Sequence, residues 1–114
     1  MNHIAKKLVN LIEKQDFSGA RQSLYHPNCK SIEPGSEALI GIQALGEKEA
    51  KWRSGIEVIN SVRCSEPIYG GRYFAIGITW QITYKGQSPT FWEELALFEV
   101  QNEKIISEQF FYTA

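Results

Sequence analysis

Residues 72–85 (RYFAIGITWQITYK) and residues 90–101 (TFWEELALFEVQ) are two long runs that decide the fold of this chain. Apolar or aromatic side chains recur at every second position, and this alternation is typical of strands with one face in a core. In the first run, one strand face is predicted to carry Phe74, Ile76, Ile78, Trp80, Ile82 and Tyr84, and the other to carry Tyr73, Ala75, Thr79, Gln81 and Thr83. Strands of this length twist strongly, so the sheet that they form must curl.

Two further strands extend this pair. Residues 56–64 precede the first run, residues 104–112 follow the second, and both alternate in the same manner. The connections contain residues that favour turns: Gly70-Gly71, Lys85-Gly86-Gln87 and Asn102-Glu103. The second half of the chain is therefore predicted to be a meander of four consecutive antiparallel strands.

The first half has helical periodicity instead. Apolar side chains recur at helical spacing in the first turns, at Ile4, Leu8, Leu11 and Ile12. Two more helices are predicted over residues 17–24, with Asp16 as the cap, and over residues 42–53. A short extended segment at 29–33 lies between them. Helices followed by a meander predict one α+β domain over 1–114, a curved antiparallel sheet wrapped around N-terminal helices with a cone-shaped pocket between the layers.

The composition excludes several classes of function. The chain has 114 residues, a net charge of −1 and no basic run, which argues against a nucleic-acid partner. No apolar run approaches the ~20 residues of a membrane span, so no membrane partner and a cytoplasmic location are expected. Cys29 and Cys64 are 35 positions apart and the only histidines are His3 and His26. We therefore expect reduced thiols, no metal and no cofactor.

Most of the chain resembles a known family. The segments that carry the resemblance are LYHP at 24–27, SIE at 31–33, Gly41 followed by Ala44, Lys48 and Trp52, FAI at 74–76, TYKGQ at 83–87, ELALFEV at 94–100, KI at 104–105 and EQFFY at 108–112. They are similar to the SnoaL-like branch of the nuclear transport factor 2-like superfamily. Glu103 departs from the family's usual turn glycine, which costs about 1 kcal/mol in left-handed geometry or forces another turn.

The resemblance implies a cystatin-like α+β cone, a homodimer packed through the sheet, and a pocket for a small, mostly apolar organic molecule. The superfamily includes enzymes similar to ketosteroid isomerases, polyketide cyclases and dehydratases, together with many proteins that catalyse nothing. Fold likeness alone does not choose among these functions. The residues independently favour a homodimer, because both faces of the long strands carry apolar side chains and a bare apolar face is unfavourable on a monomer.

Acid–base chemistry in such a pocket must fall to glutamate. The only aspartate, Asp16, is expected to cap a helix. Glu94 shares a strand face with Trp92 and Phe98, where apolar surroundings would raise its pKa toward that of a base working near neutrality. Glu33 precedes Pro34, where the chain passes the mouth of the cone. The alternative for Glu94 is a cross-strand ion pair or a solvent-facing position.

Five further residues are candidates for ligand contacts. Trp52 and Trp80 are large enough to form pocket walls, although both could be ordinary core residues. Gln109 alternates with Phe111 on the last strand, so the two could supply a hydrogen bond and an apolar contact. His26 could pair with Glu33, although a histidine before proline is more often a loop residue.

Three interpretations therefore remain open. The chain could be a SnoaL-like small-molecule-binding protein, an acid–base isomerase, cyclase or dehydratase that uses a pocket glutamate, or a dimerisation module with a filled interior. We favour the binding protein, because the expected aspartate base is missing. No Ser-His-Asp set, glycine-rich phosphate loop or ligand cluster supports hydrolysis, nucleotide binding or metal chemistry.

Overall fold

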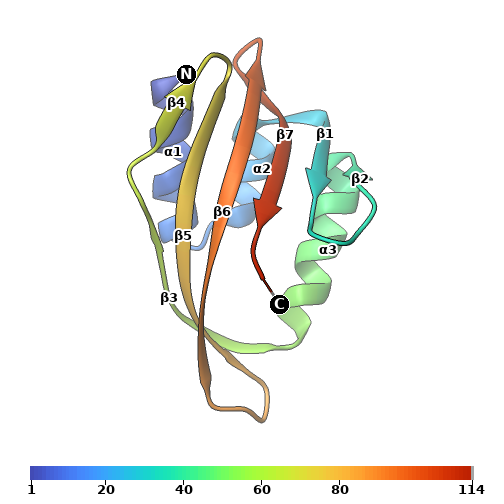
Figure 1. The fold of residues 1–114 in the computed structure, drawn as a ribbon. Helices are drawn as coiled ribbons and strands as arrows, with labels where there is room; N and C mark the ends of the chain where they lie inside the picture. Colours follow the sequence, from blue (N-terminus) through green and yellow to red (C-terminus); the bar gives the residue numbers. More distant parts are fainter. Residues whose placement is uncertain (114) are drawn as a thin grey trace.

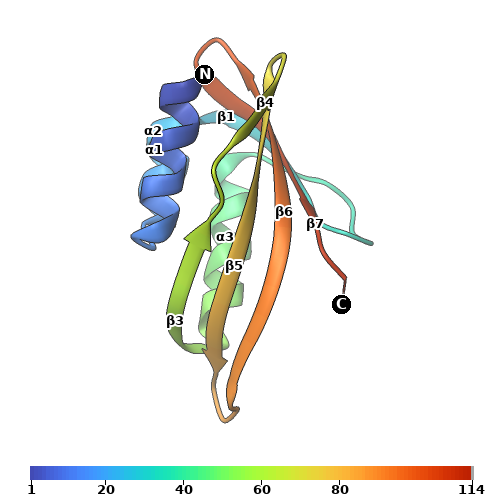
Figure 2. The same ribbon diagram turned by 60° about the vertical axis from the view of Figure 1, so that its left-hand side comes forward.

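Three helices lie on one face of a curved sheet in the computed structural model, which describes residues 1–113 (Figure 1). The helices are α1 (Asn2–Glu13), α2 (Phe17–Leu24) and α3 (Ile42–Ser54). The strands are β1 (Tyr25–Ile32), β2 (Leu39–Ile40), β3 (Ile56–Cys64), β4 (Ile68–Gly70), β5 (Tyr73–Tyr84), β6 (Pro89–Gln101) and β7 (Lys104–Phe111). Figure 2 shows the long strands bending along their length, with all three helices on the same side.

The sheet has seven strands in the order β2-β1-β7-β6-β5-β3, and β4 pairs separately with β5. The predicted α+β fold and curved sheet are confirmed, with one correction. The sheet is mixed and not wholly antiparallel, because β1 pairs with β7 in parallel, with Ser31 opposite Glu108. No turn signal marks such a pair, since it joins segments from the two ends of the chain.

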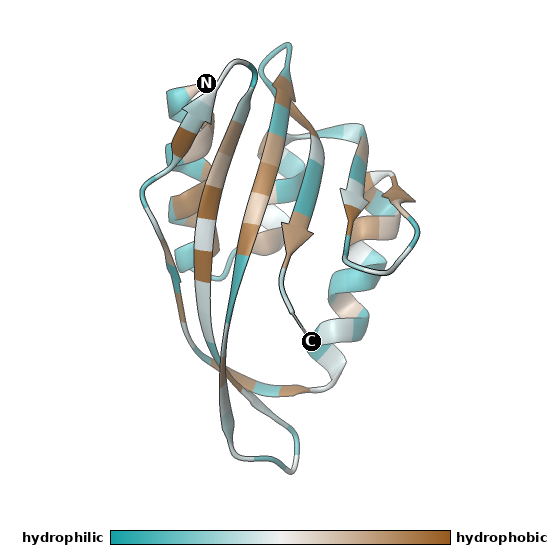
Figure 3. Ribbon diagram, in the orientation of Figure 1, coloured by the Kyte–Doolittle hydropathy of each residue, from teal (hydrophilic) through white to brown (hydrophobic). Residues whose placement is uncertain are grey.

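The core forms where the alternating face of the sheet meets the apolar face of α1. Ile4 and Leu8 on α1 are almost fully buried, as are Phe74 on β5 and Phe98 on β6. The two phenyl rings face each other across the strand pair and stack with their centroids 4.9 Å apart. Figure 3 shows the same alternation of hydrophobic and polar residues along β5. The periodicity that predicts the strands therefore also determines which face meets the helices.

Two local features follow directly from the sequence. Asp16 caps α2, since its Oδ1 accepts a hydrogen bond from the Gly19 amide at 3.0 Å. At the β6–β7 turn, Asn102 and Glu103 both have positive φ angles, 50° and 64°. Glu103 thus adopts the left-handed conformation that glycine usually supplies in a two-residue hairpin turn. None of the helices within residues 1–113 is long and apolar enough to cross a membrane.

Candidate functional site

A cavity of about 430 Å³ lies between the helices and the concave face of the sheet. All three helices contribute to its lining, together with β1, β5, β6 and β7. Leu8, Ile12, Leu45, Ile78 and Phe98 give it largely apolar walls. A volume of several hundred Å³ with few polar groups is typical of sites for small organic molecules. The interior of the cone is therefore hollow and not filled by side chains.

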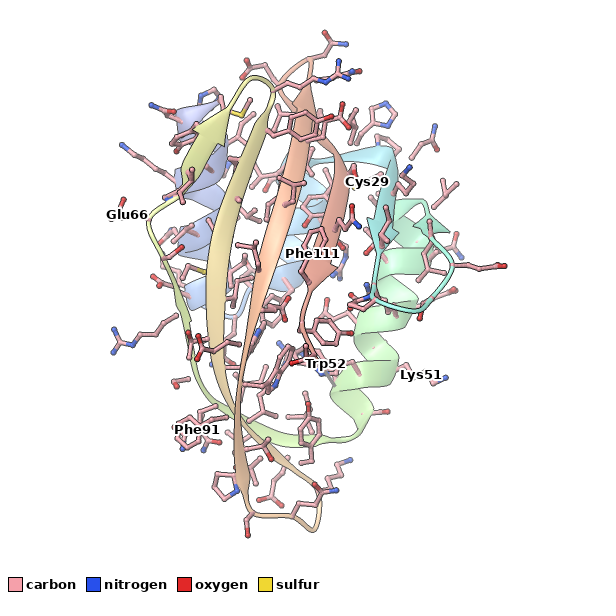
Figure 4. All side chains as sticks on the ribbon, in the orientation of Figure 1. Cys29, Lys51, Trp52, Glu66, Phe91 and Phe111 are labelled. Atoms are coloured by element: carbon pink, nitrogen blue, oxygen red, sulfur yellow. The ribbon has the colours of Figure 1, made fainter. Side chains whose placement is uncertain are left out.

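Five aromatic side chains form a continuous wall of this cavity. The Trp52 and Trp80 rings meet edge to face with centroids 5.5 Å apart, and Phe17 lies 6.2 and 5.9 Å from them. Trp92 stacks on Trp80 at 5.7 Å, and Tyr112 meets the edge of Trp92 at 5.8 Å. In Figure 4, Trp52 on α3 points toward the sheet, whereas the neighbouring Lys51 points away from it. Residues of the helices and residues of the sheet therefore form this wall together.

Glu94 projects from β6 into these aromatic surroundings. Its Oε2 accepts a hydrogen bond of 3.2 Å from the indole Nε1 of Trp80. Burial raises the pKa of the Glu94 carboxyl to about 7, helped by the negative charge of Glu33 and only partly opposed by the Trp80 hydrogen bond. A carboxyl group with this pKa exists in both protonation states near neutrality, which suits it to exchange protons with a bound molecule.

Glu108 on β7 lies in a closed hydrogen-bond network. The hydroxyl of Tyr25 donates to its Oε1 at 2.5 Å, and the hydroxyl of Ser31 donates to its Oε2 at 2.6 Å. The ammonium group of Lys48 on α3 donates to Ser31 at 2.9 Å. Burial raises the pKa of Glu108, and these hydroxyl groups partly offset that rise. Because both carboxyl oxygens have donors, Glu108 is satisfied by the chain itself.

Glu33 forms a second cluster at the mouth of the cavity. Its Oε2 lies 2.8 Å from the Lys48 Nζ, and its Oε1 accepts a hydrogen bond of 2.7 Å from the hydroxyl of Tyr112. Partial burial and the Glu33 carboxylate raise the pKa of Tyr112 to about 12, so this hydroxyl keeps its proton. Lys48 therefore links Glu33 at the mouth to the network around Glu108.

Four of the seven residues selected from the sequence line the cavity: Glu94, Glu33, Trp52 and Trp80. Gln109 and Phe111 do not, because they alternate out of phase with Glu108 and occupy the opposite face of β7. His26 is exposed on β1, where its Nδ1 accepts a hydrogen bond from the Asn28 amide at 3.0 Å. The structure brings His26 and Glu33 into no mutual hydrogen bond among the described residues.

Four residues of the site were not selected from the sequence: Tyr25, Ser31, Lys48 and Glu108. Glu108 had a detectable signal, since it alternates with Phe110 and Tyr112 and therefore belongs to an aromatic strand face. Tyr25 and Ser31 had none, because only the parallel pairing of β1 with β7 brings them to Glu108. Across residues 1–113, no group of three or more His, Cys, Asp and Glu side chains is arranged to hold a metal ion.

Comparison with known proteins identifies the family of this chain and several solved structures that share its fold. The sequence model of the SnoaL-like domain family matches residues 1–112. A proposed SnoaL-like polyketide cyclase from Mesorhizobium loti is 26% identical and superposes with a TM-score of 0.87, covering 96% of this chain and 97% of that one. No curated protein sequence matches the chain.

Two more distant structures share the fold. A hypothetical protein from Catenulispora acidiphila with a ketosteroid isomerase-like fold, in complex with trimethylamine, has a TM-score of 0.80 at 16% identity, covering 96% of this chain and 85% of that one. TerC, co-crystallised with polyporic acid, has a TM-score of 0.77 at 13% identity, covering 97% and 89%. At these identities the likeness concerns the fold alone.

The raised pKa of Glu94 makes a prediction about stability. Its carboxyl titrates near 4.5 when unperturbed and near 7 in the folded chain. Between these values the folded state holds a proton that the unfolded state has released, so the free energy of unfolding should fall as pH rises from about 4.5 to 7. The loss from Glu94 is at most roughly 3 kcal/mol, at about 1.4 kcal/mol for each pKa unit.

Urea denaturation at pH 5, 6, 7 and 8 should therefore show the Glu94→Gln variant losing less stability with pH than the wild type and exceeding it at pH 8. Glu108 retains part of the slope in both proteins, because burial raises its pKa as well. Glu57→Gln, at an exposed position of β3, is the matched control and should follow the wild type. Parallel curves for Glu94→Gln and the wild type would contradict the shift.

Proposed function

The chain belongs to the family of SnoaL-like domains, and from this premise we propose that it binds a small, largely apolar organic molecule in the cavity between helices and sheet. The observation that carries the proposal is the open volume of about 430 Å³ behind apolar walls. A dimerisation module with no ligand would be expected to fill this space, because packed interiors leave few voids larger than a water molecule.

Two structures with this fold support a small-molecule ligand in general terms. The Catenulispora acidiphila protein was crystallised with trimethylamine, and TerC with polyporic acid. Both are small organic molecules of very different shape. For this chain, they support the proposal that a domain of this fold binds a small organic molecule, with the side chains of its own cavity deciding which one.

A second candidate function is acid–base catalysis by Glu94. The specific observation in its favour is a carboxyl group with a pKa of about 7 in an apolar, aromatic cavity. Such a group can remove a proton from carbon next to a carbonyl and return it elsewhere, as an isomerase, cyclase or dehydratase requires. Glu33 is less suited to the role, because Lys48 and Tyr112 already engage its two oxygens.

We also propose a homodimer formed through the outer face of the sheet. Phe91, Leu95 and Phe111 are 70%, 48% and 45% exposed, and Leu95 lies directly opposite Phe111 on the neighbouring strand. Figure 4 labels Phe91 and Phe111, at the two ends of this patch. A self-complementary contact between two copies would bury these side chains.

The location of the protein in the cell stays a prediction.

Ligand binding should be sensitive to the mouth of the cavity. Ser36 lines the cavity but is exposed, so Ser36→Trp should fold normally and obstruct entry. Fluorescence titration with N-phenyl-1-naphthylamine, a neutral apolar dye that emits when it is buried, should give about tenfold or weaker affinity for the variant. Ser88→Trp in the exposed β5–β6 turn is the matched control. Equal affinity in Ser36→Trp and the control would contradict binding in this cavity.

Catalysis by Glu94 should appear as hydrogen exchange. With 2-tetralone in deuterated buffer, the wild type should accelerate exchange of the protons next to the carbonyl, followed by NMR. Glu94→Gln should lower that acceleration by about 10²-fold or more, since a positioned base contributes roughly 10²–10⁴-fold. Glu57→Gln should behave as the wild type. An absence of acceleration, or equal rates for Glu94→Gln and the wild type, would count against the catalytic candidate.

The dimer should dissociate when its apolar centre is charged. Sedimentation velocity at micromolar concentration should give the wild type twice the mass of one chain and Leu95→Lys the mass of one chain. Ile40→Lys changes an equally apolar exposed residue at the β2 edge, away from the patch, and should remain dimeric. A monomeric wild type, or a dimeric Leu95→Lys, would exclude association through this face.

A further inference from the structure

The charged groups that line the cavity do not balance. Two of its cations are engaged in close ion pairs: Arg21 Nη1 lies 2.5 Å from Glu49 Oε1, and Lys48 Nζ lies 2.8 Å from Glu33 Oε2. The two remaining charged residues of the lining are both carboxylates, Glu94 and Glu108. Four acidic and two basic side chains therefore face one largely apolar volume, which leaves an excess of negative charge when all are ionised.

The two carboxylates without an ion-pair partner differ in how the chain satisfies them. Glu108 accepts hydrogen bonds on both oxygens from Tyr25 and Ser31. Glu94 accepts on Oε2 from the Trp80 indole, and no donor reaches its Oε1 among the described residues. Glu94 is thus the group whose negative charge the chain leaves open toward the cavity.

The other titratable groups near Glu94 do not neutralise its charge. Glu33 and Glu108 act on it as negative charges, and Lys48 opposes them while already bonded to Glu33 and Ser31. The Cys64 thiol on β3 and the Tyr112 hydroxyl also lie close enough to feel its charge. Burial and Glu94 help to raise the pKa of both groups to about 12, so both stay neutral near pH 7.

The wall around Glu94 consists of the side chains that attract cations. An aromatic ring carries partial negative charge on its faces, and indoles bind organic ammonium groups most strongly. Trp80 and Trp92 stack beside the carboxylate, with Trp52, Phe17 and Tyr112 next to them. Two rings of the cavity lining already show the interaction: the Lys48 Nζ lies 5.4 Å from the centroid of the Phe110 ring, and the Arg53 guanidinium lies 5.3 Å from the centroid of Phe17.

We infer that the ligand of this cavity is an organic cation, a small apolar molecule whose alkylated ammonium group lies against the indole rings beside the Glu94 carboxylate. The inference rests on the proposed function, because it names the chemical class of the molecule that the cavity binds. An anionic ligand would meet repulsion from Glu94 and Glu108. A neutral ligand would either leave ionised Glu94 buried without a partner, which is unfavourable in an apolar volume, or bind only the protonated form of the carboxyl.

Binding of such a cation is linked to the protonation of Glu94. A positive charge beside the carboxylate favours its ionised form and lowers its pKa from about 7. The cation should therefore bind more tightly as pH rises from 6 to 8, and binding near pH 7 should release protons. A neutral molecule of the same shape should show the opposite trend or none, because it gains nothing when Glu94 ionises.

The test compares two molecules that differ in charge alone: 4-(trimethylammonio)benzyl alcohol and its neutral isostere 4-tert-butylbenzyl alcohol. The quaternary group keeps its charge at every pH, so any pH dependence belongs to the protein. Displacement of N-phenyl-1-naphthylamine from the wild type should show the cation binding about tenfold more tightly than the isostere at pH 8, or ~1.4 kcal/mol. The preference should shrink at pH 6 and disappear in Glu94→Gln.

Glu57→Gln is the control and should retain the full preference for the cation. Retained dye binding by Glu94→Gln shows that the variant is folded, so a loss of preference there reports on the carboxylate. Equal binding of the two molecules, or tighter binding of the isostere at pH 8, would overturn the inference and leave the proposed function standing. Failure of both molecules to displace a bound dye would also overturn it. Failure of the dye itself to bind the wild type would contradict the proposed function.

Discussion

The mismatch in length between the central strands and the helices that cover them creates the site. At ~3.3 Å per residue, β5 and β6 extend about 40 Å, whereas α1 and α3 reach only about 20 Å at 1.5 Å per residue. One helix cannot cover such a sheet, so α1 packs against β3 at one edge and α3 against β1 and β2 at the other, as Figure 1 shows. The sheet bends between them, and the cavity occupies the space that neither helix fills.

A carboxylate buried in that cavity is stabilised only by hydrogen-bond donors, by a nearby cation or by taking up a proton. Glu108 and Glu94 lie on the same concave face, on neighbouring strands, and both are buried enough for their pKa values to rise. Glu108 gains two hydroxyl donors from β1 and thereby ties β1, β7 and α3 together. Glu94 gains one weak indole donor. The first arrangement serves the fold, whereas the second leaves a carboxyl oxygen available to a bound molecule.

The sequence predicted the parts of the site that depend on local periodicity. Alternation grouped Glu94 with Trp92 and Phe98 on one face of β6, and helical spacing grouped Trp52 with Leu45. The structure then shows that these faces line the cavity. On the last strand, periodicity did not decide which face meets the helices. Each face pairs a polar residue with an aromatic one, Gln109 with Phe111 on one side and Glu108 with Phe110 on the other. Only the pairing of Phe98 with Glu108 settles the phase, and it puts Gln109 outside the cavity. The network of Tyr25, Ser31 and Lys48 depends on contacts between distant segments, which no local pattern encodes.

The two roles considered for Glu94 make different demands on its pKa. A base must be ionised to accept a proton, and at neutral pH a carboxyl with a pKa of about 7 is ionised only in part. A bound ammonium group would complete the ionisation and at the same time reduce the affinity of Glu94 for protons. Such a ligand therefore makes Glu94 a weaker base while increasing the fraction of Glu94 that is ionised. Glu94 can remove a proton from a bound cation only when the positive charge of that cation makes the proton more acidic. The chemistry of the ligand therefore decides whether Glu94 only binds it or also catalyses a reaction on it.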